Sequence, residues 1–304
     1  MVYAVVFPGQ GSQSLGMADA WTSHPAGGAV LDEASEALGR DVVTGCHDEA
    51  ALATTGFVQP ALLACGVAAF RVLEAEGVAG WVGTAGHSLG EFGALVAADV
   101  LTLTEALEVV VTRGRAMQRA GQERPGTMTA LLGLGADDAD VLCDEARGDD
   151  VLLVANHNSP VQVVVSGSVV AIERLEALAK ERKIRAVRLA VAGAFHSPLM
   201  DPAVAEIDAA LDAVTWRPPR FPIAENVTGE LVHDPVELAS LLRRHVVSPV
   251  RWEACVRSLV GAGATTIVEA GVGDVLTKLL KRIDPEVRGL AVGSPEATPE
   301  LAGG

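Results

Sequence analysis

The chain has 304 residues, of which 49% are hydrophobic and 20% are charged. This length and composition predict a folded protein with a sizeable core, built as one large domain or as a domain that carries an insertion. The formal net charge of −16 makes nucleic acid and anionic membrane surfaces unsuitable partners. We expect no membrane span, because no apolar run is long enough, and no signal peptide, because the N-terminus lacks a basic segment.

The four cysteines are far apart in the sequence and form no CxxC motif; they are Cys46, Cys65, Cys143 and Cys255. This spacing predicts free thiols in the core and neither a metal site nor a redox motif. Free thiols are typical of a reducing compartment, so we expect a cytoplasmic protein.

The first third of the chain alternates strands with helices. Its hydrophobic pattern predicts strands at 2–7 and 81–85 and helices at 27–39, 60–77, 89–98 and 104–120. Pro60 suits the first turn of a helix, and Thr104 is a candidate N-cap. A glycine-rich loop, Gly9 to Gln13, follows the first strand.

The pattern changes after residue 125. Strands are expected at 127–134, 151–156, 162–166 and 184–191, and helices at 137–147 and 169–182. The order β-α-β-β-α-β is that of a ferredoxin-like unit. We therefore predict an α/β protein in which a small subdomain at 126–193 is inserted into a larger α/β domain formed by 1–125 and 194–304. The last third adds helices at 200–214, 236–246, 251–262 and 274–283 and strands at 221–224 and 265–269.

Residues 86–90 read Gly-His-Ser-Leu-Gly and match the nucleophile elbow G-x-S-x-G. Small residues are needed on both sides of Ser88, because a side chain at Gly86 or Gly90 would clash with the crossing backbone. The alternative is a glycine-rich turn in which Ser88 only caps a helix. Glu91 falls in the first helical turn, where we expect its carboxylate to interact with the helix dipole and to have no catalytic role.

A serine nucleophile requires a base. His87 adjoins Ser88 in sequence, so the elbow should turn its side chain away from Oγ and leave it a packing role. His196 follows an apolar strand in the segment Gly-Ala-Phe-His-Ser. A loop above a sheet is where a base can be held, so His196 is the better candidate.

Several short motifs follow one another in a specific order. They are FPGQGSQ at 7–13, GHSLGE at 86–91, Arg113 in VVTRGRAMQ, GAFHS at 193–197 and SPVRW at 248–252. In this order and spacing the chain resembles the malonyl-CoA:acyl carrier protein transacylases, including the discrete acyltransferases of polyketide synthases, over almost its whole length. The resemblance implies an α/β-hydrolase-like core with a ferredoxin-like insert.

The resemblance also implies roles for individual residues. Ser88 would be the nucleophile and His196 its general base. The backbone N–H groups of Leu89 and Gln10 would form the oxyanion hole. Arg113 would bind the free carboxylate of a malonyl group through its planar guanidinium, although an isolated arginine is ordinarily a solvated helix residue.

Four further residues are implied in the substrate site: Phe195, Gln59, Asn158 and His245. Phe195 directly precedes the base. In the polyketide acyltransferases that the chain resembles, phenylalanine here accompanies malonyl as the substrate, and its ring would occupy the space of an α-methyl group. His245 stands where relatives often have the glutamine whose side-chain carbonyl orients the catalytic histidine. A neutral His245 can accept that hydrogen bond, whereas a protonated one would oppose a His196 imidazolium; a backbone carbonyl is the alternative.

The leading hypothesis is transfer of a malonyl group from malonyl-CoA to the phosphopantetheine thiol of an acyl carrier protein, in fatty acid or polyketide biosynthesis, without a cofactor and by a monomer. The alternatives are a thioester hydrolase on the same scaffold and a non-catalytic docking protein. Because carrier proteins are typically acidic, docking requires a local basic patch; the alternative is ordinary solvated faces. Candidate patches are Lys180, Arg182, Lys183 and Arg185, and Lys278, Lys281 and Arg282.

Overall fold

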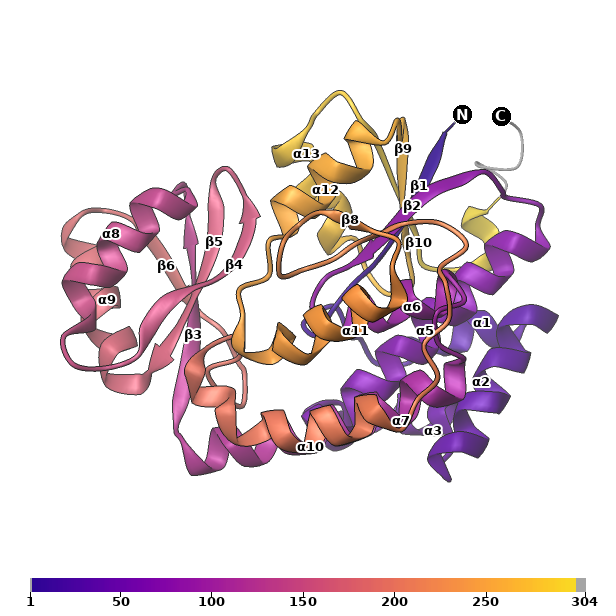
Figure 1. The fold of residues 1–304 in the computed structure, drawn as a ribbon, viewed down its shortest axis with the longest axis horizontal. Coiled ribbons are helices and arrows are strands. Elements are labelled where there is room, and N and C mark those ends of the chain that lie inside the picture. The colour runs from indigo at the N-terminus through magenta and orange to yellow at the C-terminus, as the bar shows by residue number, and fades with distance from the viewer. Residues whose placement is uncertain (1, 299–304) are drawn as a thin grey trace.

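Two separate β-sheets organise this mixed α/β protein (Figure 1). The structure is a computed structural model, and it describes residues 2–298. The larger sheet has the strand order β10-β9-β1-β2-β7-β8, and the smaller has the order β4-β5-β3-β6. Figure 1 shows the smaller sheet, with its helices α8 and α9, set to one side of the larger one.

The larger sheet is parallel except for its last pair, β7 and β8. Its strands are β1 (Tyr3–Phe7), β2 (Trp81–Gly86), β7 (Ile223–Ala224), β8 (Leu231–Val232), β9 (Thr266–Ala270) and β10 (Arg288–Val292). Every residue of β1 is buried, because its alternate side chains enter two different cores. Helices on both faces of a parallel sheet produce this continuous apolar strand.

Helices cover both faces of the larger sheet. They are α1 (Asp19–Thr22), α2 (Pro25–Leu38), α3 (Val42–Gly45), α4 (Glu49–Leu52), α5 (Thr55–Ala75), α6 (Gly90–Ala97), α7 (Leu103–Glu123), α10 (Asp201–Asp212), α11 (Pro235–Arg244), α12 (Trp252–Gly261) and α13 (Val275–Ile283). Short 3₁₀ turns add η1 (Pro198–Met200), η2 (His245–Val247) and η3 (Pro295–Ala297). One core holds α5, α6 and α7, and the other holds α12 and α13.

Helix α5 is long and apolar enough to cross a membrane by length and composition. This departs from our expectation that no segment would reach such a length. However, 89% of its apolar window is buried inside the protein, where it packs against α2 and α7. The burial identifies α5 as a core helix.

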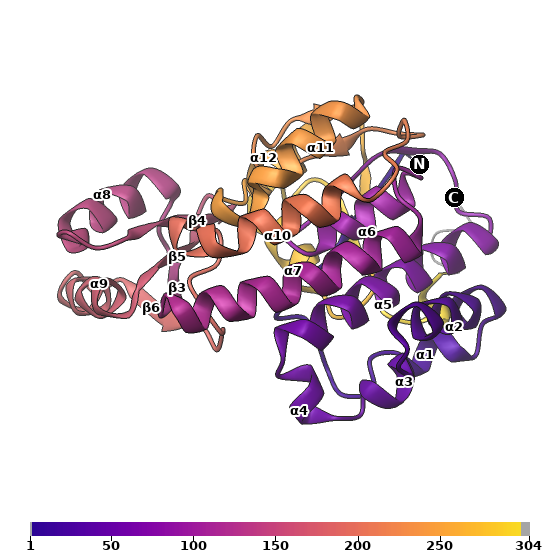
Figure 2. The same cartoon turned by 60° about the horizontal axis from the view of Figure 1, so that its bottom comes forward.

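The smaller sheet is antiparallel throughout. It contains β3 (Gly126–Leu132), β4 (Leu152–Ser159), β5 (Gln162–Ser168) and β6 (Arg185–Arg188), and α8 (Ala136–Arg147) and α9 (Val169–Glu181) pack against it. The chain reaches this sheet through α7 and returns through α10, and these two helices run side by side (Figure 2).

Two local predictions were wrong, and five elements were not predicted: α1, α3, α4, β8 and β10. Helix α5 begins at Thr55, so Pro60 lies inside the helix rather than in its first turn. Helix α7 is capped by Thr102 and not by Thr104, because Thr102 and Glu105 form a reciprocal capping box. Strand β10 was not predicted, since only one of its residues is fully buried and its pattern is weak.

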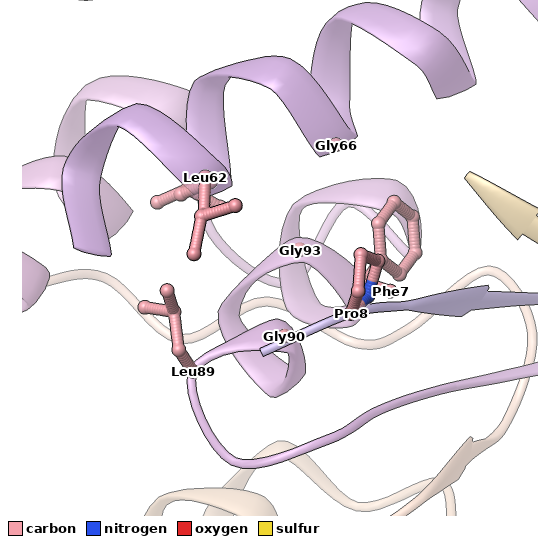
Figure 3. A pocket seen from close by; sticks show the side chains of 8 residues that line it. Phe7, Pro8, Leu62, Gly66, Leu89, Gly90 and Gly93 are labelled. Atoms are coloured by element: carbon pink, nitrogen blue, oxygen red, sulfur yellow. The ribbon is translucent and has the colours of Figure 1, made fainter. Parts of the chain in front are cut away.

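Close approach of β1 and α6 requires glycine. A Cβ atom on Gly90 would lie 2.0 Å from the carbonyl oxygen of Phe7, and one on Gly86 would lie 1.9 Å from the carbonyl carbon of Gly90. Figure 3 shows Gly90 beside Phe7 and Pro8 at the end of β1, with Gly93 and Gly66 facing the same space. A side chain at either glycine would therefore clash with the backbone, as predicted. The turn between β2 and α6 lies directly against the central strand.

Candidate active site

Ser88 occupies the turn between β2 and α6 with φ of 52°, a left-handed conformation that is rare for a residue with a side chain. Asn226, which follows β7, binds two backbone groups of this turn. Its Oδ1 accepts from the Ser88 N–H at 2.8 Å, and its Nδ2 donates to the Gly86 carbonyl at 2.7 Å. The turn is therefore fixed by a side chain from the neighbouring strand.

His196 meets Ser88 from the segment between β6 and η1. Its Nε2 lies 2.7 Å from Ser88 Oγ. Its Nδ1 faces two backbone carbonyls, those of His245 at 3.0 Å and Ser248 at 3.2 Å. Because carbonyls only accept, Nδ1 carries the proton, and Nε2 of the neutral ring is left to accept the Ser88 hydroxyl proton.

A buried arginine completes the hydrogen-bond network. Arg113, from α7, donates through Nη2 to Ser88 Oγ at 3.1 Å and through Nη1 to Gln59 Oε1 at 2.7 Å. Gln59 in turn donates to Gln10 Oε1 at 3.2 Å. Arg113 is 1% exposed, and among residues 2–298 it has no ion-pair partner.

The surroundings keep the base neutral and the arginine charged. Burial, reinforced by the Arg113 charge, lowers the pKa of His196 to about 3. Burial also lowers the pKa of Arg113 to about 10, which still leaves the guanidinium protonated at neutral pH. A neutral imidazole beside a hydroxyl is the form that can act as a general base.

A cleft of about 470 Å³ opens above these groups. Its lining includes Ser88, His196, Gln10, Gln59, Asn158 and Phe195, so these predicted site residues meet in one space. Residues from β3, β4 and β5 form part of the wall, and the cleft therefore lies between the two sheets. Leu89 also lines it, beside the nucleophile.

His87 lines the cleft beside Ser88, and its side chain has the packing role that we predicted. Its Nε2 donates to Asn158 Oδ1 at 2.8 Å, and its ring lies 5.5 Å from that of Trp252. The carbonyl of His87 also faces the glycine-rich loop, where a Cβ on Gly9 would lie only 2.4 Å away. Its imidazole thus joins the elbow to β4 and α12, away from Ser88 Oγ.

The side chain of His245 is not part of the cleft lining. It is 1% exposed, and its Nε2 lies 3.7 Å from Glu91 Oε2. The sequence left two acceptors that could orient His196, the side chain of His245 or a backbone carbonyl. The structure has the backbone carbonyl of His245 in this position. Glu91 lies in the first turn of α6, as predicted. Burial raises its pKa and thereby favours the protonated acid over the expected carboxylate.

Asn226 is the site residue that sequence reasoning missed. Both of its side-chain bonds are to backbone atoms about 140 positions earlier in the chain. No local pattern encodes such a contact. The one signal in the sequence was an asparagine shortly after the strand predicted at 221–224.

The lowered pKa of His196 predicts how Ser88 reactivity depends on pH. The base form persists as pH falls, so labelling of Ser88 by a fluorophosphonate should keep its rate from pH 8 to about pH 5.5. An unperturbed imidazole would lose half of its base form near pH ~6.5. The labelling rate should be measured by mass spectrometry, with circular dichroism to verify folding and H196A as the inactive control. A drop in rate centred near pH 6.5 would contradict the lowered pKa.

Comparison with known proteins places this geometry in a family. Residues 4–290 match the model of the acyl transferase domain. A malonyl CoA-acyl carrier protein transacylase of Bacillus subtilis is 36% identical, over 98% of this chain and 95% of its own length. The crystal structure of an acyl-carrier-protein S-malonyltransferase from Burkholderia pseudomallei superposes with a TM-score of 0.95 at 38% identity and 99% coverage of both chains.

A second solved structure contains a malonyl-transacylase in complex with its acyl-carrier protein from a type II polyketide synthase. It matches with a TM-score of 0.95 at 35% identity, over 99% of both chains. The family match, the relatives and the assembled site agree, and we conclude that this chain belongs to the acyl transferase domain family, among the malonyl-CoA:acyl carrier protein transacylases.

Proposed function

We propose that this protein transfers a malonyl group from malonyl-CoA to the phosphopantetheine thiol of an acyl carrier protein, in fatty acid or polyketide biosynthesis. The observation that carries the proposal is Arg113. A buried guanidinium without an ion-pair partner among the described residues lies 3.1 Å from Ser88 Oγ. A short acyl group that ends in a carboxylate would supply the missing partner when its carbonyl is at the nucleophile.

The reaction divides into two steps of the same kind. Ser88 Oγ attacks the thioester carbonyl while its proton moves to His196 Nε2, and the departing CoA thiolate takes that proton. The carrier thiol then attacks the serine ester, its proton passes to His196, and the proton returns to Ser88 Oγ. The N–H groups of Leu89 and Gln10 would stabilise the oxyanion in both steps.

Detection of the acyl-enzyme tests this function. Incubation with malonyl-CoA should add one malonyl group per chain, and peptide mapping should locate it on Ser88. S88A should acquire none, because among the described residues no other nucleophilic oxygen contacts His196 Nε2. Addition of carrier protein should then remove the malonyl group as malonyl-carrier. An adduct in S88A would refute the mechanism, and release as free malonate would favour the hydrolase alternative, which none of the named relatives supports.

Selectivity for a malonyl group is assigned to Arg113 and Phe195. Phe195 is buried and lines the cleft next to the base, where its ring would take the space of an α-methyl group. Gln59 fixes the guanidinium through Nη1. Asn158, which lines the cleft and accepts from His87, completes the substrate-facing polar groups.

Arg113 should account for most of the preference for malonyl-CoA over acetyl-CoA. Removing the charged partner of a desolvated carboxylate costs about 2–5 kcal/mol. We therefore expect R113A to lose roughly a hundredfold or more in kcat/KM for malonyl-CoA while acetyl-CoA loses little. R113K should recover part of the loss, since lysine lacks the planar fork. Equal losses for the two substrates would reduce Arg113 to a structural role.

Carrier protein docking is assigned to helix α13. Val275, Leu276 and Leu279 on this helix line the cleft. Lys278, Lys281 and Arg282 on the same helix are exposed. The basic residues of α9 and β6 contribute nothing to the cleft lining, and Figure 1 shows α9 on the outer side of the smaller sheet.

Charge reversal can separate the two basic clusters. The double variant K281E/R282E should raise the KM for carrier protein about tenfold, because interface charges contribute on the order of 1 kcal/mol each. Its acylation by malonyl-CoA should stay at the wild-type rate. K180E/K183E is the matched control and should change neither reaction. A raised KM for carrier protein in K180E/K183E, with no change in K281E/R282E, would indicate that the carrier protein docks at α9.

We propose further that the fold is an α/β-hydrolase-like core, formed by 1–125 and 194–304, with a ferredoxin-like subdomain at 126–193. The separate core beneath the smaller sheet and its strand order support this division. Buried free cysteines among the described residues support a cytoplasmic location. The exposed large apolar residues are scattered over several elements, which supports a monomer.

A further inference from the structure

Beneath the dyad lies a buried acid–base pair that takes no part in the acyl transfer steps. Glu91, on α6, is 2% exposed, and His245, at the start of η2, is 1% exposed. Glu91 Oε2 and His245 Nε2 are 3.7 Å apart. Glu91 Oε2 and both ring nitrogens of His245 are buried without a hydrogen-bond partner. Buried polar atoms are ordinarily satisfied, so three adjacent exceptions require a physical reason.

Each member of the pair is connected to a group that positions one of the two residues Ser88 and His196. The Glu91 carboxyl group accepts from the backbone N–H of Asn226, the residue whose side chain clamps Ser88. His245 supplies, through its own backbone carbonyl, the acceptor for His196 Nδ1. A bond between the two side chains therefore connects the support of the nucleophile to the support of the base.

We propose that Glu91 and His245 are positioning residues that share one proton: Glu91, as a carboxylic acid, donates to His245 Nε2 and holds η2 in register with the elbow. The inference rests on the proposed acyl transfer by Ser88 and His196. A movement of about 1 Å brings the two atoms to hydrogen-bond distance. The bond would satisfy Glu91 Oε2 and His245 Nε2 together.

The charges around the pair favour this neutral form over an ion pair. An imidazolium at His245 would face the Arg113 guanidinium from α7 and lie near the rings of His196, 5.2 Å away, and of His87. A carboxylate at Glu91 would face Glu225; the Asn226 N–H and the Arg113 charge favour it, but burial and Glu225 outweigh both. Burial favours the neutral form of both groups, because it raises the pKa of Glu91 and lowers that of His245.

A neutral His245 matters for the chemistry. His196 becomes an imidazolium in each step of acyl transfer, and a second cation behind it would disfavour that state. The carboxylic acid of Glu91, by donating its proton to Nε2, would hold His245 in the neutral state.

The test compares variants that keep or remove the hydrogen bond. E91L and H245L should lower the single-turnover rate of Ser88 malonylation at least tenfold, with the KM for malonyl-CoA changed less than twofold. E91Q and H245Q, whose amides can donate or accept in place of the native groups, should recover most of that loss. The double variant E91L/H245L should be no slower than the slower single variant, because the two act as a unit. Rates are compared at least 10 °C below the melting temperature of each variant.

A direct measurement keeps the proposal testable if a leucine variant fails to fold. Nitrogen-15 NMR of histidine-labelled wild type should show His245 as a neutral imidazole from pH 5.5 to 8, with exposed His233 as the reference in the same spectra. An imidazolium at His245 near neutral pH would overturn the proposal. So would an E91Q rate as low as that of E91L, or wild-type rates in both leucine variants.

Failure of the proposed function would be distinguishable from failure of the pair. If wild type is not malonylated by malonyl-CoA, the function is wrong. The NMR state of His245 and the rate of fluorophosphonate labelling of Ser88 in the same variants would still decide whether Glu91 and His245 position the dyad.

Discussion

Ser88 adopts a backbone conformation that its own side chain disfavours, and much of the structure serves to impose it. The turn exists because β1 and α6 approach within the space that two glycines leave. It is held by Asn226, which binds the Gly86 carbonyl and the Ser88 N–H. A left-handed residue costs free energy that the surrounding contacts must offset. His196 has the same conformation, with φ of 57°, so both reacting residues depend on their supports.

One permanent charge dominates the interior of the site. Arg113 is buried among groups whose pKa values shift toward their neutral forms: His87, His196, His245 and Glu91. A carboxylate that enters such a site meets an unopposed cation at low effective dielectric, where the attraction is stronger than in water. On the proposed function, an acetyl group would leave this guanidinium without the partner that a malonyl carboxylate would supply.

The sequence predicted the alternation of elements, and which residues gather around Ser88, better than it predicted the exact limits of each element. Strand β1 was identified because a continuous apolar run is typical of a strand buried on both faces. The elbow was identified because paired glycines around a serine stood between a predicted strand and a predicted helix. The start of α5 was misplaced because proline was given its usual position, whereas a long buried helix tolerates it inside. Asn226 and the contact of Glu91 with His245 were inaccessible, since both depend on side chains that meet only after α6, β7 and η2 have packed together.

The position of His196 has a consequence for the movement of the two sheets. The base lies on the return connection from the smaller sheet, yet the carbonyls that hold it belong to η2 and Ser248, on the side of the larger sheet. The two sheets are also joined close to this point, since His87 of the elbow binds Asn158 on β4 and the backbone of β4 bonds to that of Val250. A displacement of the smaller sheet would therefore also move groups that flank Ser88 and His196, so the width of the cleft and the geometry of the two residues are mechanically coupled.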